Sequence, residues 1–297
     1  MGQVLVDQLI SGLAIGGVYA LVALGFALIF GVLRVAQFAH GELYMLSAFV
    51  VLALLPALPS AGALQFALVI GLGLLIGAGL GLLVDRGIFQ PLANAPHLSS
   101  IISAVGLSIA LQYLVSFIWG SELHPFVLAW QPGNLTIGPA SVPLLKVVII
   151  LAAVLLLGLL QALLLRSRLG RAIRATAIDA ETARLMGIDT RWTTAIAFAA
   201  GSALAGAAGV LVAALYGVTY STMGQPALLK GYTATILGGV GNLPGAVLGG
   251  LLIGVFEVLL SSVISPTWVD AVVYGLLFVM LALRPQGLLG RAVAEKL

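Results

Sequence analysis

Continuous apolar runs, each about as long as a membrane-spanning helix, constrain this chain more than any other feature of its sequence. A helix needs about 20 apolar residues to cross about 30 Å of hydrocarbon, and about eight runs approach that length. Only 8% of the residues are charged and 61% are hydrophobic, whereas a soluble domain carries roughly a quarter charged residues. The runs cover residues 8–30, 41–58, 64–84, 100–119, 143–165, 192–215, 245–263 and 268–283.

These runs predict an all-α fold, a polytopic transmembrane helical bundle of about eight spanning helices. The loops between them are short, so we expect one transmembrane domain over residues 1–297 and no separate soluble domain. A membrane β-barrel is not expected, because its strands alternate in hydrophobicity over about ten residues whereas the apolar runs here are continuous. A further stretch, 226–241, is apolar but rich in glycine, which favours a broken or re-entrant segment whose backbone is covered by protein.

The distribution of lysine and arginine predicts the orientation of the bundle. Segment 166–191 holds nearly half of the 13 basic residues, which places it in the cytoplasm by the positive-inside rule. The loop 120–142 has no lysine or arginine and is expected outside, while the side of the N-terminus stays open. The net charge of +3 is small and reflects arginines at one membrane face, so we predict no nucleic-acid binding.

The longest polar stretch, 166–191, has the signals of a small helix-turn unit. A helical pattern over 171–178 ends before Asp179, which is typical of a helix N-cap, and Gly187 suits the left-handed residue after a helix end. Two interpretations stay open: a short amphipathic helix that docks into a groove of another protein, or a linker helix that lies on the membrane surface. The apolar residues expected to be exposed here are Ala183, Leu185, Met186 and Ile188.

Polar and glycine residues interrupt the apolar runs at two places. His40 and Glu42 flank Gly41 where a run begins, and an ionisable residue at membrane depth is expensive and a candidate for function. Two roles stay open for them, a part in the solute path or gate and a structural hydrogen-bonding role at a helix break. The stretch near 238–245 has a similar composition, so we hypothesise that the two are corresponding breaks in two related halves. The candidate pathway residues are Gln37, His40, Gly41, Glu42, Gly239, Gly241 and Asn242.

Other charged residues also lie in or beside the apolar runs. Glu257 is expected to pair with a cation or a backbone donor across the bundle, and Asp270 is expected to be a solvated residue at the membrane interface. Lys146 is expected to extend to the external face. Lys230 opens the glycine-rich stretch.

The sequence carries no pattern of catalytic or cofactor-binding residues. There is no cysteine, a single His-x-Glu pair has too few ligands for zinc, and no spacing suggests a nucleophile with its base. A phosphate-binding loop needs Gly-Lys followed by Ser or Thr, whereas the lysines here follow Leu145, Leu229 and Glu295. We therefore predict that the chain is not an enzyme, binds no metal or other cofactor, and supplies no ATP site of this kind.

Ordered motifs near the start, the middle and the end of the chain indicate a family. The motifs cover residues 16–25, 37–45, 170–188, 230–246 and 283–290. Together they resemble, from end to end, the LivH-type permeases of ATP-binding-cassette (ABC) importers for branched-chain and other hydrophobic amino acids. The first motif departs mildly from the family because Gln37 stands where asparagine is usual.

This resemblance implies a permease subunit that crosses the lipid bilayer of a bacterial plasma (inner) membrane several times and forms half of the translocation pathway for branched-chain or related amino acids. It implies a second permease, identical or merely similar, two cytoplasmic ATPase subunits that use the ATP, and a periplasmic or extracellular solute-binding protein. It also implies that the middle motif contacts the ATPases. The residues implied in this coupling are Arg171, Arg174, Asp179, Glu181, Ala183, Leu185, Met186, Gly187 and Ile188.

Two other classes of transport protein fit part of the sequence. An ion-coupled secondary transporter commonly has internal repeats and broken helices, and Glu42, Glu257 and the glycines at 238–241 suit it. It leaves the helical cytoplasmic unit unexplained. A channel for a small polar solute is the other alternative, and it predicts downhill flux without an ATPase partner.

Overall fold

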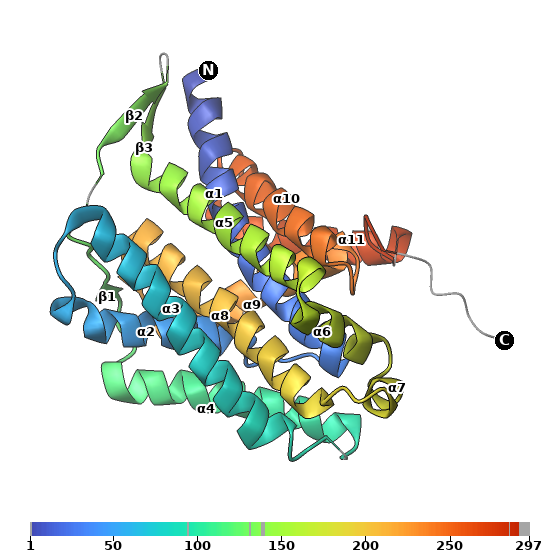
Figure 1. Ribbon diagram of the computed structural model, residues 1–297. Helices are drawn as coiled ribbons and strands as arrows, with labels where there is room; N and C mark the ends of the chain where they lie inside the picture. Colours follow the sequence, from blue (N-terminus) through green and yellow to red (C-terminus); the bar gives the residue numbers. More distant parts are fainter. Residues whose placement is uncertain (1, 94, 131, 138–139, 285, 291–297) are drawn as a thin grey trace.

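Helices make up most of the computed structural model, which describes residues 2–93, 95–130, 132–137, 140–284 and 286–290 (Figure 1). Among these residues, seven helices are long and apolar enough to cross a membrane, and Thr267–Leu283 is a shorter apolar helix. The predicted all-α polytopic membrane fold is confirmed. The helices are α1 (Gly2–Leu33), α2 (His40–Leu54), α3 (Gly62–Val84), α4 (His97–Trp119), α5 (Leu144–Arg166), α6 (Arg168–Ile178), α7 (Ala180–Leu185), α8 (Thr190–Tyr216), α9 (Gly224–Gly238), α10 (Leu243–Ser261) and α11 (Pro266–Leu283).

Two helices of the bundle are shorter than ordinary spans. The glycine-rich stretch predicted to be broken or re-entrant forms α9, a regular helix of 15 residues that extends about 22 Å and is shorter than the hydrocarbon core. Helix α2 also has 15 residues and reaches 18 only with the 3-10 turn Leu55–Ala57. Both helices therefore depend on neighbouring protein to cover their ends.

The two ends of the bundle carry different structures. At one end, short strands form two antiparallel pairs: β1 (His124–Pro125) with β4 (Val218–Thr219), and β2 (Asn134–Ile137) with β3 (Ala140–Pro143). The first turns of α1 lie at this end, because Asp7 Oδ1 is 2.9 Å from Nζ of Lys146 at the start of α5. The opposite end carries α6 and α7 (Figure 1). The positive-inside rule predicts that the arginine-rich end is the cytoplasmic one, and in that orientation the N-terminus and both strand pairs lie at the external end.

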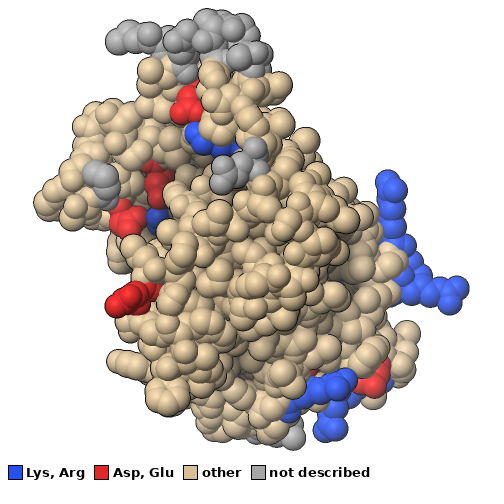
Figure 2. Space-filling model, turned by 90° about the vertical axis from the view of Figure 1, so that its left-hand side faces the viewer, with Lys and Arg blue, Asp and Glu red and all other residues tan. Residues whose placement is uncertain are grey.

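The outer surface of the bundle is largely apolar. On the face shown in Figure 2, uncharged residues cover the middle and charged side chains gather toward the margins. Large side chains on α4 and α5 are exposed, among them Phe117 at 88% and Leu151 at 63%. Such a surface is unfavourable in water and suits contact with lipid or with another membrane subunit.

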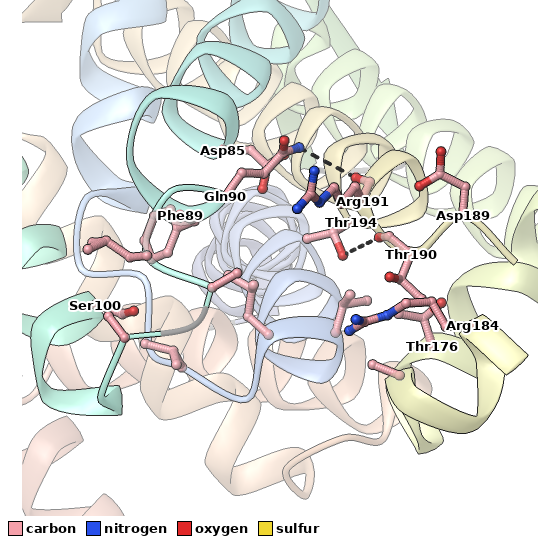
Figure 3. A pocket seen from close by; sticks show the side chains of 17 residues that line it. Asp85, Phe89, Gln90, Ser100, Thr176, Arg184, Asp189, Thr190, Arg191 and Thr194 are labelled. Atoms are coloured by element: carbon pink, nitrogen blue, oxygen red, sulfur yellow. Dashed lines mark hydrogen bonds between the residues drawn. The ribbon is translucent and has the colours of Figure 1, made fainter.

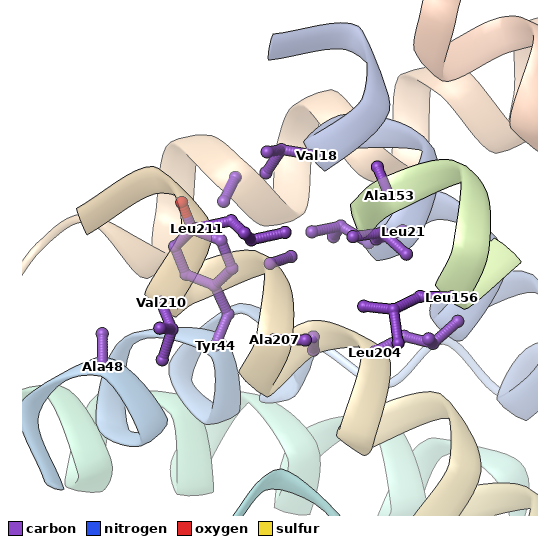
Figure 4. Packing of buried hydrophobic residues seen from close by; sticks show 14 of the residues in the cluster. Val18, Leu21, Tyr44, Ala48, Ala153, Leu156, Leu204, Ala207, Val210 and Leu211 are labelled. Atoms are coloured by element: carbon purple, nitrogen blue, oxygen red, sulfur yellow. The ribbon is translucent and has the colours of Figure 1, made fainter. Parts of the chain in front are cut away.

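The interior is built on close contacts between helix backbones. Helix α10 packs along α1 where Gly254 meets Gly16, and α3 packs along α8 where Gly77 meets Ser202; a Cβ on any of these glycines would clash. Close approach of this kind gains van der Waals contact where lipid supplies no hydrophobic driving force. The largest apolar cluster joins α1, α2, α5 and α8 (Figure 4). Its members include Val18, Leu21, Tyr44, Ala48, Ala153, Leu156, Leu204, Ala207, Val210 and Leu211.

The bundle contains two halves with the same order of elements and opposite directions in the membrane. In α1–α4 and again in α8–α11, a long helix is followed by a short helix and two further helices. Helix α3 packs along α8 as α10 packs along α1, and α1 crosses α8 where the backbones of Gly25 and Gly201 meet. Inverted halves of this kind are common in membrane transporters.

Candidate functional site

Two helix breaks meet inside the bundle. The chain leaves α1, runs without helix through 34–39 and begins α2 at His40, beside Gly25 in the last third of α1. It likewise leaves α8, runs without helix through 217–223 and begins α9 at Gly224. The backbones of Gly41 and Gly224 are in contact, so neither position has room for a Cβ. The first turns of two half-helices therefore cross inside the bundle, an arrangement typical of transporter solute sites.

The polar residues that the sequence singled out at the first break are buried at this crossing. Gln37 and His40 have no exposed surface, and Glu42 is 2% exposed. Ser108 of α4 donates a hydrogen bond to Glu42 Oε1 at 3.2 Å, and the ring of Phe26 lies edge-on to His40. Glu42 Oε2 and both polar atoms of the Gln37 side chain have no hydrogen-bond partner among the residues described. These groups face the protein interior and not lipid, while their part in solute passage stays a prediction.

The second predicted stretch forms the turn between α9 and α10 at the cytoplasmic end. Gly239 and Gly241 adopt positive φ angles of 109° and 83° there. Asn242 caps α10 by accepting a hydrogen bond from the Gly245 amide at 2.9 Å, and its Nδ2 donates to the Leu289 carbonyl at 2.7 Å. The break before α2 is therefore paired with the break before α9, and not with this turn. A pathway role for Gly239, Gly241 and Asn242 stays a prediction.

A cavity of about 380 Å³ lies in the external half of the bundle. Tyr19 of α1, Tyr44 of α2 and Tyr216 at the end of α8 line it together with Tyr220. Its position is external because Val218, another lining residue, lies in the strand that pairs with β1. Sequence reasoning missed this cavity, since its walls come from segments far apart in the chain. The feature of the sequence that could have indicated the cavity was the pair Tyr216 and Tyr220, which flank the break before α9.

Charged residues form the polar side of this cavity. Lys230 Nζ lies 2.6 Å from Glu257 Oε1 and 3.1 Å from Asp270 Oδ1, and it donates a hydrogen bond to the Tyr19 hydroxyl at 3.2 Å. The expected pairing of Glu257 is confirmed, with Lys230 as its partner. Asp270 is half exposed, and it also contacts the lysine. Glu257 Oε2 has no hydrogen-bond partner within the described part of the chain.

The cytoplasmic helix-turn unit forms as the sequence predicts. Asp179 caps α7 by accepting hydrogen bonds from the Glu181 and Thr182 amides and from the Thr182 hydroxyl, and these bonds hold the pKa of its carboxyl below the ordinary value. Gly187 has a φ of 81°, and Asp189 caps α8 by accepting from the Trp192 amide at 3.1 Å. Local capping chemistry thus determines the path of the chain between α6 and α8.

The apolar edge of this unit is narrower than expected. Leu185 and Met186 are 84% and 79% exposed, and Ile188 is partly buried. The prediction that Ala183 is exposed was wrong, because this residue is 4% exposed and lies on the side of α7 that packs against the bundle. Of the other residues that the resemblance implies in ATPase coupling, Arg171 and Glu181 are exposed, and Arg174 donates to the Leu164 carbonyl.

Arg34 connects this unit to the helix break, a contact that sequence reasoning missed. It is the one non-glycine residue of the described chain with a positive φ, at 55°. Its guanidinium donates to the carbonyls of Ala177 and Ile178 at 3.2 and 3.0 Å, so it occupies the C-terminal carbonyls of α6. The same residue begins the non-helical stretch that leads to α2. The feature of the sequence that could have indicated this contact was a single arginine directly after a long apolar run.

A second cavity, of about 510 Å³, lies between this unit and the π-helical turn Asp85–Phe89 (Figure 3). Gln90 donates to Asp85 Oδ2 at 2.7 Å and lies 3.5 Å from the Arg191 carbonyl. The end of α1, with Val32, also lines it. This cavity thus lies between the helix-turn unit and the end of α1, which Arg34 links through its hydrogen bonds to α6.

Comparison with known proteins gives matches over nearly the whole chain. The family described as branched-chain amino acid transport system / permease component matches residues 8–282. The high-affinity branched-chain amino acid transport system permease protein LivH of Salmonella typhimurium and that of Escherichia coli are each 36% identical over 298 residues, covering 98% of this chain and 97% of the relative. The corresponding protein BraD of Pseudomonas aeruginosa is 35% identical over 299 residues, with the same coverage of 98% and 97%.

Proposed function

The chain belongs to the family of permease components of branched-chain amino acid transport systems, and from this premise we propose that it forms half of the pathway of an ATP-driven importer for branched-chain or related amino acids. The observation that carries the proposal is the match over residues 8–282 together with identity of 36% over 98% of the chain. With its seven apolar spans among the described residues, the chain is a multi-pass protein of the inner membrane.

The proposal includes partner subunits that supply what this chain lacks. The ATP is bound and hydrolysed by two cytoplasmic ATPase subunits, and this chain binds no cofactor. A second permease, identical or similar, completes the pathway, and a solute-binding protein delivers the amino acid from outside. The exposed pair Leu185 and Met186 supports the ATPase contact, because a short helix with an apolar edge fits a groove of another protein.

The proposed mechanism is alternating access driven from the cytoplasmic unit. Closure of the ATPases moves α6 and α7, and Arg34 transmits this movement because its guanidinium binds the last carbonyls of α6. The non-helical stretch 34–39 follows directly, so movement reaches the first turn of α2. There Gly41 packs on Gly224 of the opposite half. Displacement of one half-helix at this contact then displaces the other, which opens the pathway to one side at a time.

The inverted halves and the charged groups within the bundle also suit an ion-coupled secondary transporter. Purification of the chain from its native host, followed by identification of the bound subunits, separates the two functions. The importer predicts ATPase subunits in fixed proportion to this chain. A chain that is purified intact, takes up solute and has no ATPase bound would contradict the proposal.

A further inference from the structure

The cavity in the external half of the bundle has two chemically different sides. One side holds Lys230 and Glu257, whose charged groups are 2.6 Å apart. The other lining residues are mainly apolar or aromatic, with Ile15, Val212 and Met223 among the tyrosines. A volume of about 380 Å³ falls within the range of roughly 300–1,000 Å³ that is typical of small-molecule sites. We propose that this cavity binds the free amino acid itself, with the zwitterionic head on the charged side and the apolar side chain on the aromatic wall.

The charged side complements both groups of an α-amino acid. The solute carboxylate is expected to approach Lys230 Nζ, which already has a second carboxylate partner in Asp270 at 3.1 Å. The Tyr19 hydroxyl accepts a hydrogen bond from Lys230 and also lies beside Glu257, so it adds a neutral polar group to this side of the cavity. The solute ammonium is expected to bind Glu257 Oε2, which has no hydrogen-bond partner in the described structure.

The charge balance favours a zwitterion over a charged solute. Lys230 and Glu257 form an ion pair with little exposure, 9% and 18% for their side chains. Separating this pair leaves Glu257 without its cation in a poorly solvated place, which is strongly unfavourable, whereas Lys230 keeps the half-exposed Asp270 as a partner at 3.1 Å. A zwitterion supplies one charge of each sign, so both members keep an opposite partner while the solute is bound. A carboxylic acid or an amine alone satisfies only one of them.

The position of the cavity fits a site within the transport path, and in this respect the inference rests on the proposed function. Tyr216 and Val218 place one side at the external end, where a binding protein would release its solute. Tyr44 comes from α2 and Met223 directly precedes α9. Both half-helices that cross at the centre of the bundle therefore contribute to the wall. A movement of that crossing alters the cavity and offers a way to release the solute inward.

Photolabelling of the complete importer in proteoliposomes tests where the solute binds. A diazirine analogue of leucine is added with the binding protein, the sample is irradiated, and labelled peptides are identified. We expect adducts in segments 212–223 and 15–19, and we expect an excess of leucine to prevent them. An excess of 4-methylpentanoate or of isopentylamine, which each lack one charged group, should leave the labelling intact. Uptake of leucine with adducts elsewhere and none in these segments would overturn the inference.

Two sets of variants test the two sides of the cavity separately. Val212→Trp fills the apolar side, and its control is Val272→Trp on α11, at a residue that is 39% exposed and outside the cavity. Lys230→Met combined with Glu257→Gln removes both charges of the buried pair and leaves only the half-exposed Asp270 without its lysine contact. Its control is Lys146→Met combined with Asp7→Asn, which removes an ion pair of 2.9 Å outside the cavity.

Loss of one charge-assisted contact lowers the affinity for a ligand by about tenfold or more. Both cavity variants should therefore lower leucine uptake and photolabelling by at least about tenfold at equal amounts of assembled complex, whereas the controls should not. If a cavity variant fails to assemble, the labelling pattern of the unmodified complex decides. Normal uptake by both cavity variants would refute the site and leave the proposed importer intact. Failure of the unmodified complex to take up leucine with ATP and binding protein would instead contradict the proposed function.

Discussion

Replacing Gly41 with alanine should disturb the crossing of the two half-helices in a measurable way. A Cβ at this position would lie 2.8 Å from the Leu228 Cβ and closer still to the carbonyl oxygen of Gly224. Carbon atoms that are not bonded prefer about 3.5–4.0 Å, so α2 and α9 would have to separate by about 1 Å. The obstacle is mainly backbone, which cannot rotate away as a flexible side chain can.

The energetic consequence follows from two opposing terms. Overpacking of a well-packed interior is unfavourable by about 1–3 kcal/mol, and the obstacle here places the clash near the upper value. Alanine favours a helix over glycine by about 1 kcal/mol. We therefore expect Gly41→Ala to destabilise the protein by about 2 kcal/mol and to lower solute uptake per assembled complex.

The control for this variant is Gly79→Ala on α3, where an added Cβ meets nothing within 4 Å. It gains the same helix propensity without the clash, so its stability should equal or exceed that of the unmodified protein. Thermal unfolding of the purified complex in detergent and uptake in proteoliposomes are the assays. If Gly41→Ala unfolds and transports like Gly79→Ala, the close contact of the half-helices has no importance for stability or transport.

Three further predictions concern the cytoplasmic unit and the orientation. Gly187→Val places a β-branched residue at a φ of 81°, which strains the backbone by at least about 1 kcal/mol and misdirects Leu185. In this variant, solute should no longer stimulate ATP hydrolysis by the complex. Normal stimulation would refute the docking role of the turn. Arg34→Ala should lower the number of solute molecules transported per ATP hydrolysed. It should have little effect on stability, because an exposed charged side chain contributes only about 0.2–1 kcal/mol to the free energy of unfolding. An unchanged number of solute molecules per ATP would contradict the connecting role of Arg34. The chain has no native cysteine, so single cysteines near Arg174 and Gly133 should react with impermeant reagents from the cytoplasmic and the external side respectively. Reaction of both from one side would overturn the orientation.

Local signals in the sequence were sufficient to predict most helices and their ends. The apolar runs correspond to helices because each must satisfy its own backbone hydrogen bonds in lipid. Asp179 and Gly187 were correctly interpreted because capping depends on residues within one turn. The exposure of Ala183 was mispredicted because α7 is too short for its pattern to define which side faces the bundle.

The arrangement of the breaks could not be derived from local signals. The composition of 238–245 resembles that of the first break, but its glycines serve a tight turn, and the partner of the first break is the stretch 217–223. Contacts such as Gly41 with Gly224, or Lys230 with Glu257, depend on how helices distant in sequence pack. The sequence could predict that Glu257 needs a partner, because a lone charge in the membrane is unfavourable, but it could not name Lys230.

Uptake of leucine by the purified complex, reconstituted with its binding protein outside and ATP on the side of the ATPases, tests the central claim most directly. The account predicts accumulation of leucine against its gradient that requires ATP, the binding protein and the ATPase subunits together, and that stops when the ATPases are inactivated. Accumulation by this chain alone, driven by an ion gradient and indifferent to ATP, would contradict it.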